Sequence, residues 1–120
     1  MQKVFNTNLF GAIQTTETFI PLLEKSTQRP PRLVFVSTPL SSFAQDSNPG
    51  AHAIYRSSKT ALNMMVVQYA HRFRDEGWEV NLSCPGFLAT NLNGYRGTGK
   101  VEGGAVNISR WRRWVWKGRR

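Results

Sequence analysis

Long apolar runs are missing from this sequence of 120 residues, and none approaches the roughly 20 residues that a bilayer-spanning helix needs. The opening segment, MQKVFNTNLFG, lacks the long apolar stretch and the small-residue cleavage site of a signal peptide. With one cysteine, Cys84, an internal disulfide is excluded, and a reducing compartment suits the chain. We therefore expect a cytoplasmic protein of one domain without a transmembrane segment.

Acidic residues are missing from the last eleven positions, although these positions hold six of the sixteen lysines and arginines. The rest of the chain carries ten basic and seven acidic residues, so most of the net charge of +9 belongs to this tail. Three of the four tryptophans also lie there: Trp111, Trp114 and Trp116. We predict a domain over residues 1–109 and a disordered, basic Trp/Arg-rich tail over residues 110–120. The tail is either an extension without function or a binding module for nucleic acid or an anionic membrane.

Hydrophobic periodicity predicts two helices and two strands before the tail. Apolar residues recur at helical spacing over residues 3–26, where Pro21 predicts a kink, and again over residues 54–75. Short apolar runs over residues 32–37 and 78–84 predict strands. The first run is continuous and rich in β-branched and aromatic residues, which favours a strand buried on both faces. The order of these elements predicts an α/β fold, a three-layer, doubly wound parallel sheet.

Polar residues follow the carboxyl ends of both predicted strands, where ligands bind in sheets of this type. Thr38 follows the first strand and Cys84 ends the second. Tyr55 comes after the long loop that leaves the first strand, and Lys59 lies four residues further on. This spacing places the phenol and the ammonium one turn apart on the same helix face. By itself it also fits a surface tyrosine and lysine.

Four segments together carry a family resemblance: NTNLFG, RLVFVST, YRSSK and VNLSCPGFLATNL. In this order and at this spacing they resemble the C-terminal half of a classical short-chain dehydrogenase/reductase. Among members of that family, they are most similar to carbonyl-reductase-like ones. The resemblance covers residues 3–108. It implies part of a Rossmann-type sheet that lacks the N-terminal βα units, and hydride transfer between NAD(P)(H) and a carbonyl or a secondary alcohol.

The resemblance also implies a role for each catalytic candidate. Tyr55 would be the general acid/base, and Lys59 would lower the pKa of its phenol and hold the nicotinamide ribose. Thr38 would hydrogen-bond the substrate oxygen, with Ser37 as a substitute. Asn8 would hold a water that relays protons to the lysine.

Cofactor contacts are implied at the turn after the second strand. Pro85, Gly86 and Thr90 match the family segment that receives the nicotinamide carboxamide, although a tight turn would favour proline and glycine in any case. His52 has no partner at metal-ligand spacing, so we predict no metal site.

A glycine-rich phosphate loop, followed about 20 residues later by an acid or arginine, is not found in the chain. We therefore expect a truncated reductase that binds NAD(P)H weakly or not at all and turns over nothing measurable. The family resemblance slightly favours NADPH. The expected partners are a small carbonyl or alcohol substrate and another reductase chain, either a second copy or an intact homologue, docked through the two long helices.

Overall fold

The structure is a computed structural model that describes residues 1–45 and 52–110. Its α-helices are α1 (Gln2–Phe5), α2 (Gly11–Glu24), α3 (Ala53–Arg72) and α4 (Val101–Arg110), and its strands are β1 (Arg32–Val36) and β2 (Glu79–Ser83). A π-helical turn, Asn6–Phe10, joins α1 to α2, and short 3-10 turns cover Pro39–Ser41, Phe43–Gln45 and Asn91–Asn93. No helix among these residues is long and apolar enough to cross a bilayer.

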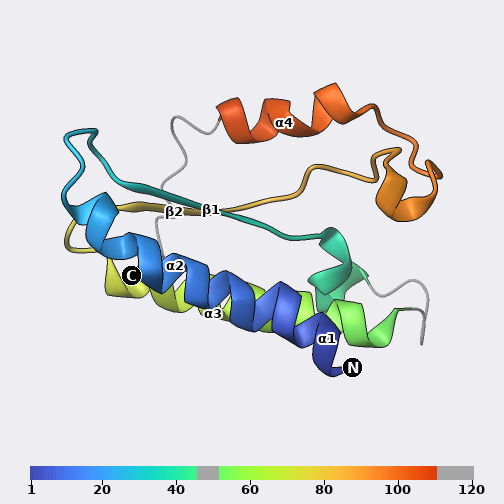
Figure 1. The fold of residues 1–120 in the computed structure, drawn as a ribbon, viewed down its shortest axis with the longest axis horizontal. Coiled ribbons are helices and arrows are strands. Elements are labelled where there is room, and N and C mark those ends of the chain that lie inside the picture. The colour runs from blue at the N-terminus through green and yellow to red at the C-terminus, as the bar shows by residue number, and fades with distance from the viewer. Residues whose placement is uncertain (46–51, 111–120) are drawn as a thin grey trace.

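The two strands form a parallel sheet in which Arg32 pairs with Glu79 and Val36 pairs with Ser83. Helices α2 and α3 lie together on one face of the sheet, and α4 lies on the other side (Figure 1). Since β1 and β2 run parallel, their carboxyl ends meet at one edge, next to the N-terminal end of α3. The α/β class predicted from the sequence is confirmed.

Burial of β1 differs from the prediction. Leu33 and Phe35 are buried, but Val34 and Val36 remain 37% and 47% exposed. Strand side chains alternate between the two faces of a sheet, so this pattern means that only one face of β1 is covered. Both long helices pack on that face, so a strand with apolar residues on both faces is only half buried.

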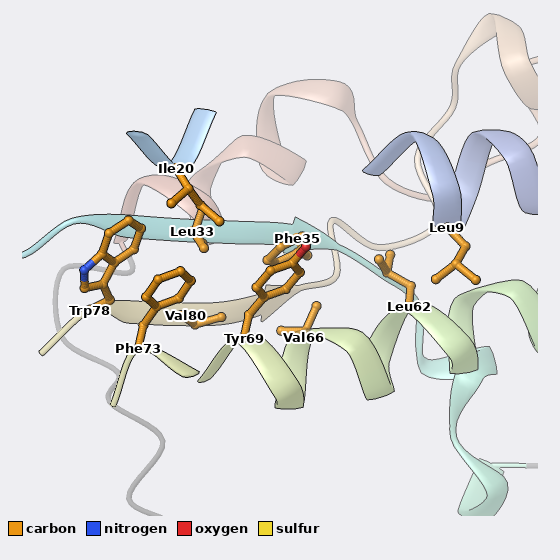
Figure 2. Close-up of a cluster of buried hydrophobic side chains, with 10 residues drawn as sticks. All are labelled: Leu9, Ile20, Leu33, Phe35, Leu62, Val66, Tyr69, Phe73, Trp78 and Val80. Carbon is orange, nitrogen blue, oxygen red and sulfur yellow. The ribbon is translucent and has the colours of Figure 1, made fainter. Parts of the chain in front are cut away.

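The core fills the space between α2, α3 and the sheet (Figure 2). It contains the predicted apolar stripe of α3, represented by Leu62, Val66, Tyr69 and Phe73. The aromatic rings follow one another along the core: the centroid distances are 5.7 Å from Phe35 to Tyr69, 6.4 Å from Tyr69 to Phe73 and 4.2 Å from Phe73 to Trp78. These contacts fix the rotation of α3 about its axis, and with it the direction of the polar residues on its other faces.

The first long helix contains a feature that periodicity did not predict. At the π-helical turn the Gly11 N–H donates to the carbonyl of Asn6, five residues earlier. Such turns insert one extra residue into a helix and are frequent at functional sites. The helix then continues through Pro21 to Glu24.

Helix α4 was not predicted, because its sequence, VEGGAVNISR, contains two glycines that lower helix propensity. Gly104 is buried against the loop that follows β2, and a Cβ on it would lie 2.3 Å from Leu88 Cδ1. The glycine therefore permits the close approach of α4 to this loop. The predicted tail falls almost wholly on residues 111–120, outside the described residues, as does the binding module proposed for it.

Candidate active site

Tyr55 and Thr38 meet at the carboxyl end of β1. Tyr55 is the third residue of α3, Thr38 stands two residues beyond the strand, and the Thr38 hydroxyl is close enough to the phenol to act on its pKa. Tyr55 is 38% exposed, so a small molecule can reach its phenol. The Thr38 hydroxyl also accepts from the N–H of Leu40, 3.3 Å away, which caps the turn that follows.

The pKa of Tyr55 is raised above its ordinary value. Burial of the phenol is the largest cause, the Cys84 thiol at the end of β2 adds to it, and the Thr38 hydrogen bond acts in the opposite direction. Because Val36 pairs with Ser83, Cys84 follows β2 at the same edge of the sheet at which Thr38 follows β1. Three segments distant in the sequence therefore converge on Tyr55.

Lys59 lies one turn along α3 from Tyr55, but its ammonium points to the strand. Its Nζ donates to the backbone carbonyl of Val36 over 2.9 Å, and burial lowers the pKa of the amine. The expectation that Lys59, with the charge of an oxidised nicotinamide nearby, lowers the pKa of Tyr55 stays a prediction. Among the causes within this chain, burial of the phenol is the largest and raises the pKa.

Asn8 reaches the site through a serine. It projects from the π-helical turn, and its Nδ2 donates to Ser58 Oγ over 3.0 Å. The Ser58 hydroxyl, which is fully buried, in turn donates to the backbone carbonyl of Tyr55 over 2.7 Å. Asn8 is thus tied to the first turns of α3, and the structure shows no direct bond between Asn8 and Lys59 among the described residues.

The three expected cofactor residues lie in the loop after β2. Gly86, the residue after Pro85, has a φ of +91°, a backbone conformation that favours glycine. Its N–H donates to Cys84 Sγ over 3.4 Å. Nothing lies within 4 Å of the position a Gly86 Cβ would take, so this backbone is open to a ligand. Thr90 instead forms a reciprocal cap with Asn93 that closes the Asn91–Asn93 turn.

Sequence reasoning missed Asn63, a polar residue that contacts the segment on either side of Thr38. Asn63 on α3 contacts both Ser37 and Ser41, which flank Thr38 in the chain. A polar residue between Leu62 and the other stripe residues was a signal, but its partners lie more than twenty positions away and could not be named from the sequence.

Two further features lie near the site without joining it. An open groove of about 520 Å³ runs between the segment 40–43 and α3, with Phe43, Arg56 and Met64 among its lining residues. Tyr55 and Lys59 are not part of its lining.

His52 stands at the N-terminus of α3 with a φ of +57° and no side-chain cap. Across residues 1–45 and 52–110, no three histidine, cysteine or acidic side chains gather in a group that could hold a metal ion.

Comparison with known proteins identifies the family. The sequence model described as short chain dehydrogenase matches residues 1–100. The chain belongs to the short-chain dehydrogenase family. Members of this family are oxidoreductases that typically bind NAD(P)(H), and the match confirms the family resemblance inferred from the four sequence segments.

Relatives of this short-chain dehydrogenase are longer proteins. Short-chain dehydrogenase anuI of Penicillium roqueforti is 37% identical over 117 residues, which cover 91% of this chain and 46% of that protein. C-signal of Myxococcus xanthus is 34% identical over 94 residues, covering 78% of this chain and 55% of that protein. The chain thus spans about half the length of these curated relatives.

The fold of the short-chain dehydrogenase chain also matches a solved structure. Salutaridine reductase from Papaver somniferum superposes with a TM-score of 0.79 at 24% identity, over 95% of this chain and 51% of that one. At this identity the match shows the fold alone. It confirms that the two strands and their helices are part of a Rossmann-type arrangement.

Proposed function

We propose that this chain carries the proton-transfer part of an NAD(P)(H)-dependent site that reduces a carbonyl or oxidises a secondary alcohol. The observation that carries the proposal is that Lys59 binds the last carbonyl of β1, at Val36, while Tyr55 lies one turn away on the same helix and Thr38 follows the same strand end. Beyond the ends of parallel strands is where such sheets bind ligands. The phenol there is exposed enough to meet a substrate.

Tyr55 is proposed to exchange a proton with the substrate oxygen. Because its pKa is raised, the phenol is protonated at neutral pH and can donate to a carbonyl oxygen, which suits reduction. Thr38 carries a hydroxyl that both donates and accepts, so it can hold the same oxygen beside Tyr55. Lys59 and Asn8 are proposed to supply and relay the proton behind Tyr55.

The residues of this chain fit one end of a dinucleotide. Lys59 offers donors for ribose hydroxyls, and the open space at Gly86, next to Pro85, is where a planar ring could approach the backbone. Thr90 would contribute only if its cap with Asn93 opened. Bound here, the dinucleotide would supply or accept the hydride. For its phosphates the sequence offers no glycine-rich loop, and we therefore propose weak binding, with NADPH slightly favoured over NADH.

Cofactor binding by the chain alone is the first test. In a fluorescence titration with NADPH, we expect no saturation in the micromolar range. Saturation at micromolar NADPH would show that this chain suffices to bind the cofactor and would contradict this part of the proposal.

Turnover is tested in a chimera. Residues 1–109 replace the corresponding half of the Penicillium roqueforti relative, and NADPH-dependent reduction of a panel of ketones is followed by absorbance. We expect Tyr55→Phe to lower kcat by about 10² or more, because proton transfer to the substrate oxygen is lost. Tyr95→Phe, at a tyrosine that is 69% exposed, is the matched control and should leave the rate unchanged. Equal rates for both variants would refute the assignment of Tyr55.

A further inference from the structure

A buried hydrogen-bond network joins Ser37 and Ser41, the serines before and after Thr38, to Asn63 of α3. The two serines are 8% and 7% exposed. The Ser37 hydroxyl donates to Asn63 Oδ1 over 2.6 Å, and Asn63 Nδ2 donates to Ser41 Oγ over 2.7 Å. One amide therefore contacts the chain on both sides of Thr38.

We propose that Asn63 is a positioning residue of this site: its amide clamps the segment 37–41 so that the Thr38 hydroxyl meets the Tyr55 phenol. The inference rests on the proposed function for its catalytic meaning. The clamp itself is a structural claim and can be tested without turnover.

The chemistry of the network requires an amide at position 63. The Ser41 hydroxyl donates to the Thr38 carbonyl over 2.5 Å, so it needs a donor from the other side, and Asn63 Nδ2 is that donor. The Ser37 hydroxyl donates its only proton to Asn63, so it needs an acceptor, and Oδ1 is that acceptor. A carboxylate could not donate to Ser41, and an apolar side chain could neither donate to Ser41 nor accept from Ser37, so either would break the link from α3 to the segment 37–41 even though Ser41 keeps its bond to the Thr38 carbonyl.

The network reaches the Thr38 backbone as well as its neighbours. The Thr38 carbonyl accepts from both the hydroxyl and the N–H of Ser41, at 2.5 and 3.1 Å. On the strand side, the N–H of Ser37 donates to the Ser83 carbonyl over 2.8 Å, which fixes the segment to β2. Thr38 is thus held at its own carbonyl by Ser41 and on the strand side through the backbone of Ser37.

Helix α3 carries both Tyr55 and the Asn63 amide that binds the segment around Thr38. Tyr55 and Asn63 are eight residues apart on it, and Leu62, beside Asn63, is 2% exposed in the core. Thr60 adds a third link, since its hydroxyl donates to the Ser41 carbonyl over 2.9 Å. The phenol and the clamp therefore belong to one packed helix, which also binds the segment that carries Thr38.

The test measures the pKa of Tyr55 in the full chain. Tyrosine labelled with ¹³C at Cζ is titrated by NMR, and the Tyr55 signal is assigned from its loss in Tyr55→Phe. A hydroxyl that donates to the phenolate favours ionisation, so losing the Thr38 contact should raise the pKa of Tyr55. We expect Asn63→Ala to raise it, Thr38→Val to raise it, and the double variant to raise it no further than Thr38→Val alone.

Three results would overturn the clamp. The first is no shift in Asn63→Ala where Thr38→Val shifts, and the second is an Asn63→Ala shift that adds in full to that of Thr38→Val. The third is no shift in Thr38→Val, because the contact through which Asn63 acts would then be missing; the proposed function is judged separately, from turnover of the chimera.

Two further variants separate positioning from general loss of stability. Val66→Ala truncates a core residue of α3, 4% exposed, that takes no part in the network, and it should lower stability without moving the pKa of Tyr55. An equal shift in Val66→Ala would contradict the proposal. If Asn63→Ala does not fold, Ser37→Ala removes the Oδ1 contact and the 3.5 Å contact with Ser41 Oγ, keeps the Nδ2 contact, and must raise the pKa of Tyr55 in the same non-additive way.

Discussion

Replacing Tyr69 by phenylalanine removes one hydrogen bond between the two long helices and keeps the core ring. The Tyr69 hydroxyl of α3 donates to Glu17 Oε1 of α2 over 2.8 Å, and Arg72 binds the same carboxylate at 3.0 and 3.1 Å. The ring stays stacked between Phe35 and Phe73 in the variant. The change therefore isolates the polar tip of a residue that is 3% exposed.

The expected loss of stability is about 1 kcal/mol at pH 7. A hydrogen bond to a charged group contributes about 1.5–3 kcal/mol. The Glu17 side chain is 46% exposed and keeps Arg72 in the variant, so water and the guanidinium replace part of what is lost. In a domain of this size, 1 kcal/mol lowers the Tm by about 4–8 °C.

The pH dependence of this difference follows from both partners. The Tyr69 bond, followed by Arg72, lowers the pKa of Glu17. A carboxyl whose folded pKa is depressed stabilises the fold above its unfolded pKa and loses that effect as the pH falls through its folded pKa. We therefore expect the wild-type advantage over Tyr69→Phe to shrink at pH 3.

At alkaline pH the sign reverses for the phenol. Burial and the neighbouring Glu17 raise the pKa of Tyr69 to about 12, against about 10 in an unfolded chain. The stabilisation is complete below pH 10 and is lost as the pH rises to about 12, at up to about 1.4 kcal/mol per pH unit. In Tyr69→Phe this contribution to the pH dependence of the free energy of unfolding is missing.

Urea unfolding followed by circular dichroism at pH 3, 7 and 10.5 measures these differences, with Glu17→Gln as the partner variant. If Tyr69→Phe unfolds at the wild-type midpoint at pH 7, or loses as much stability at pH 3 as at pH 7, the hydrogen bond does not stabilise the fold as described. Glu17→Gln and Tyr69→Phe should also be non-additive, since they remove the same bond.

Two further predictions concern packing. Phe73→Ala should lower the free energy of unfolding by about 3–5 kcal/mol, because the ring is 2% exposed and stacks on Trp78; cooperative unfolding that persists with a loss below 1 kcal/mol would contradict this. In α4, Gly103→Ala meets nothing within 4 Å and should slow amide exchange by stabilising the helix by about 0.5–1 kcal/mol. Gly104→Ala should give none of this gain, because its Cβ meets Leu88, and equal protection in both variants would refute the close contact.

Local patterns in the sequence were sufficient for most elements of the fold. The stripe that ends in Tyr69 and Phe73 predicted α3 and its buried face, and both are confirmed. The order of elements predicted the parallel sheet, since antiparallel strands need no helix between them. Helix α4 was missed because packing of Gly104 against Leu88 outweighs the low helix propensity of its glycines.

The candidate site was predictable as a set of residues but not as a set of contacts. Tyr55, Lys59 and Thr38 could be named because strand ends and helical spacing follow from position in the chain. Asn63 could not be named, because its partner Ser37 is 26 residues away. Burial raises the pKa of Tyr55, and burial depends on what the fold places around the phenol.

Residue order alone therefore determined the family, the α/β class and the choice of candidate site residues, because each depends on residue types at short, regular spacings. Tertiary structure decided the rest: which face of β1 is covered, where the Lys59 ammonium points, and which amide supports Thr38. These features depend on distances between segments far apart in the chain. Such distances exist only once α3 has packed against the sheet and aligned its polar residues with the end of β1.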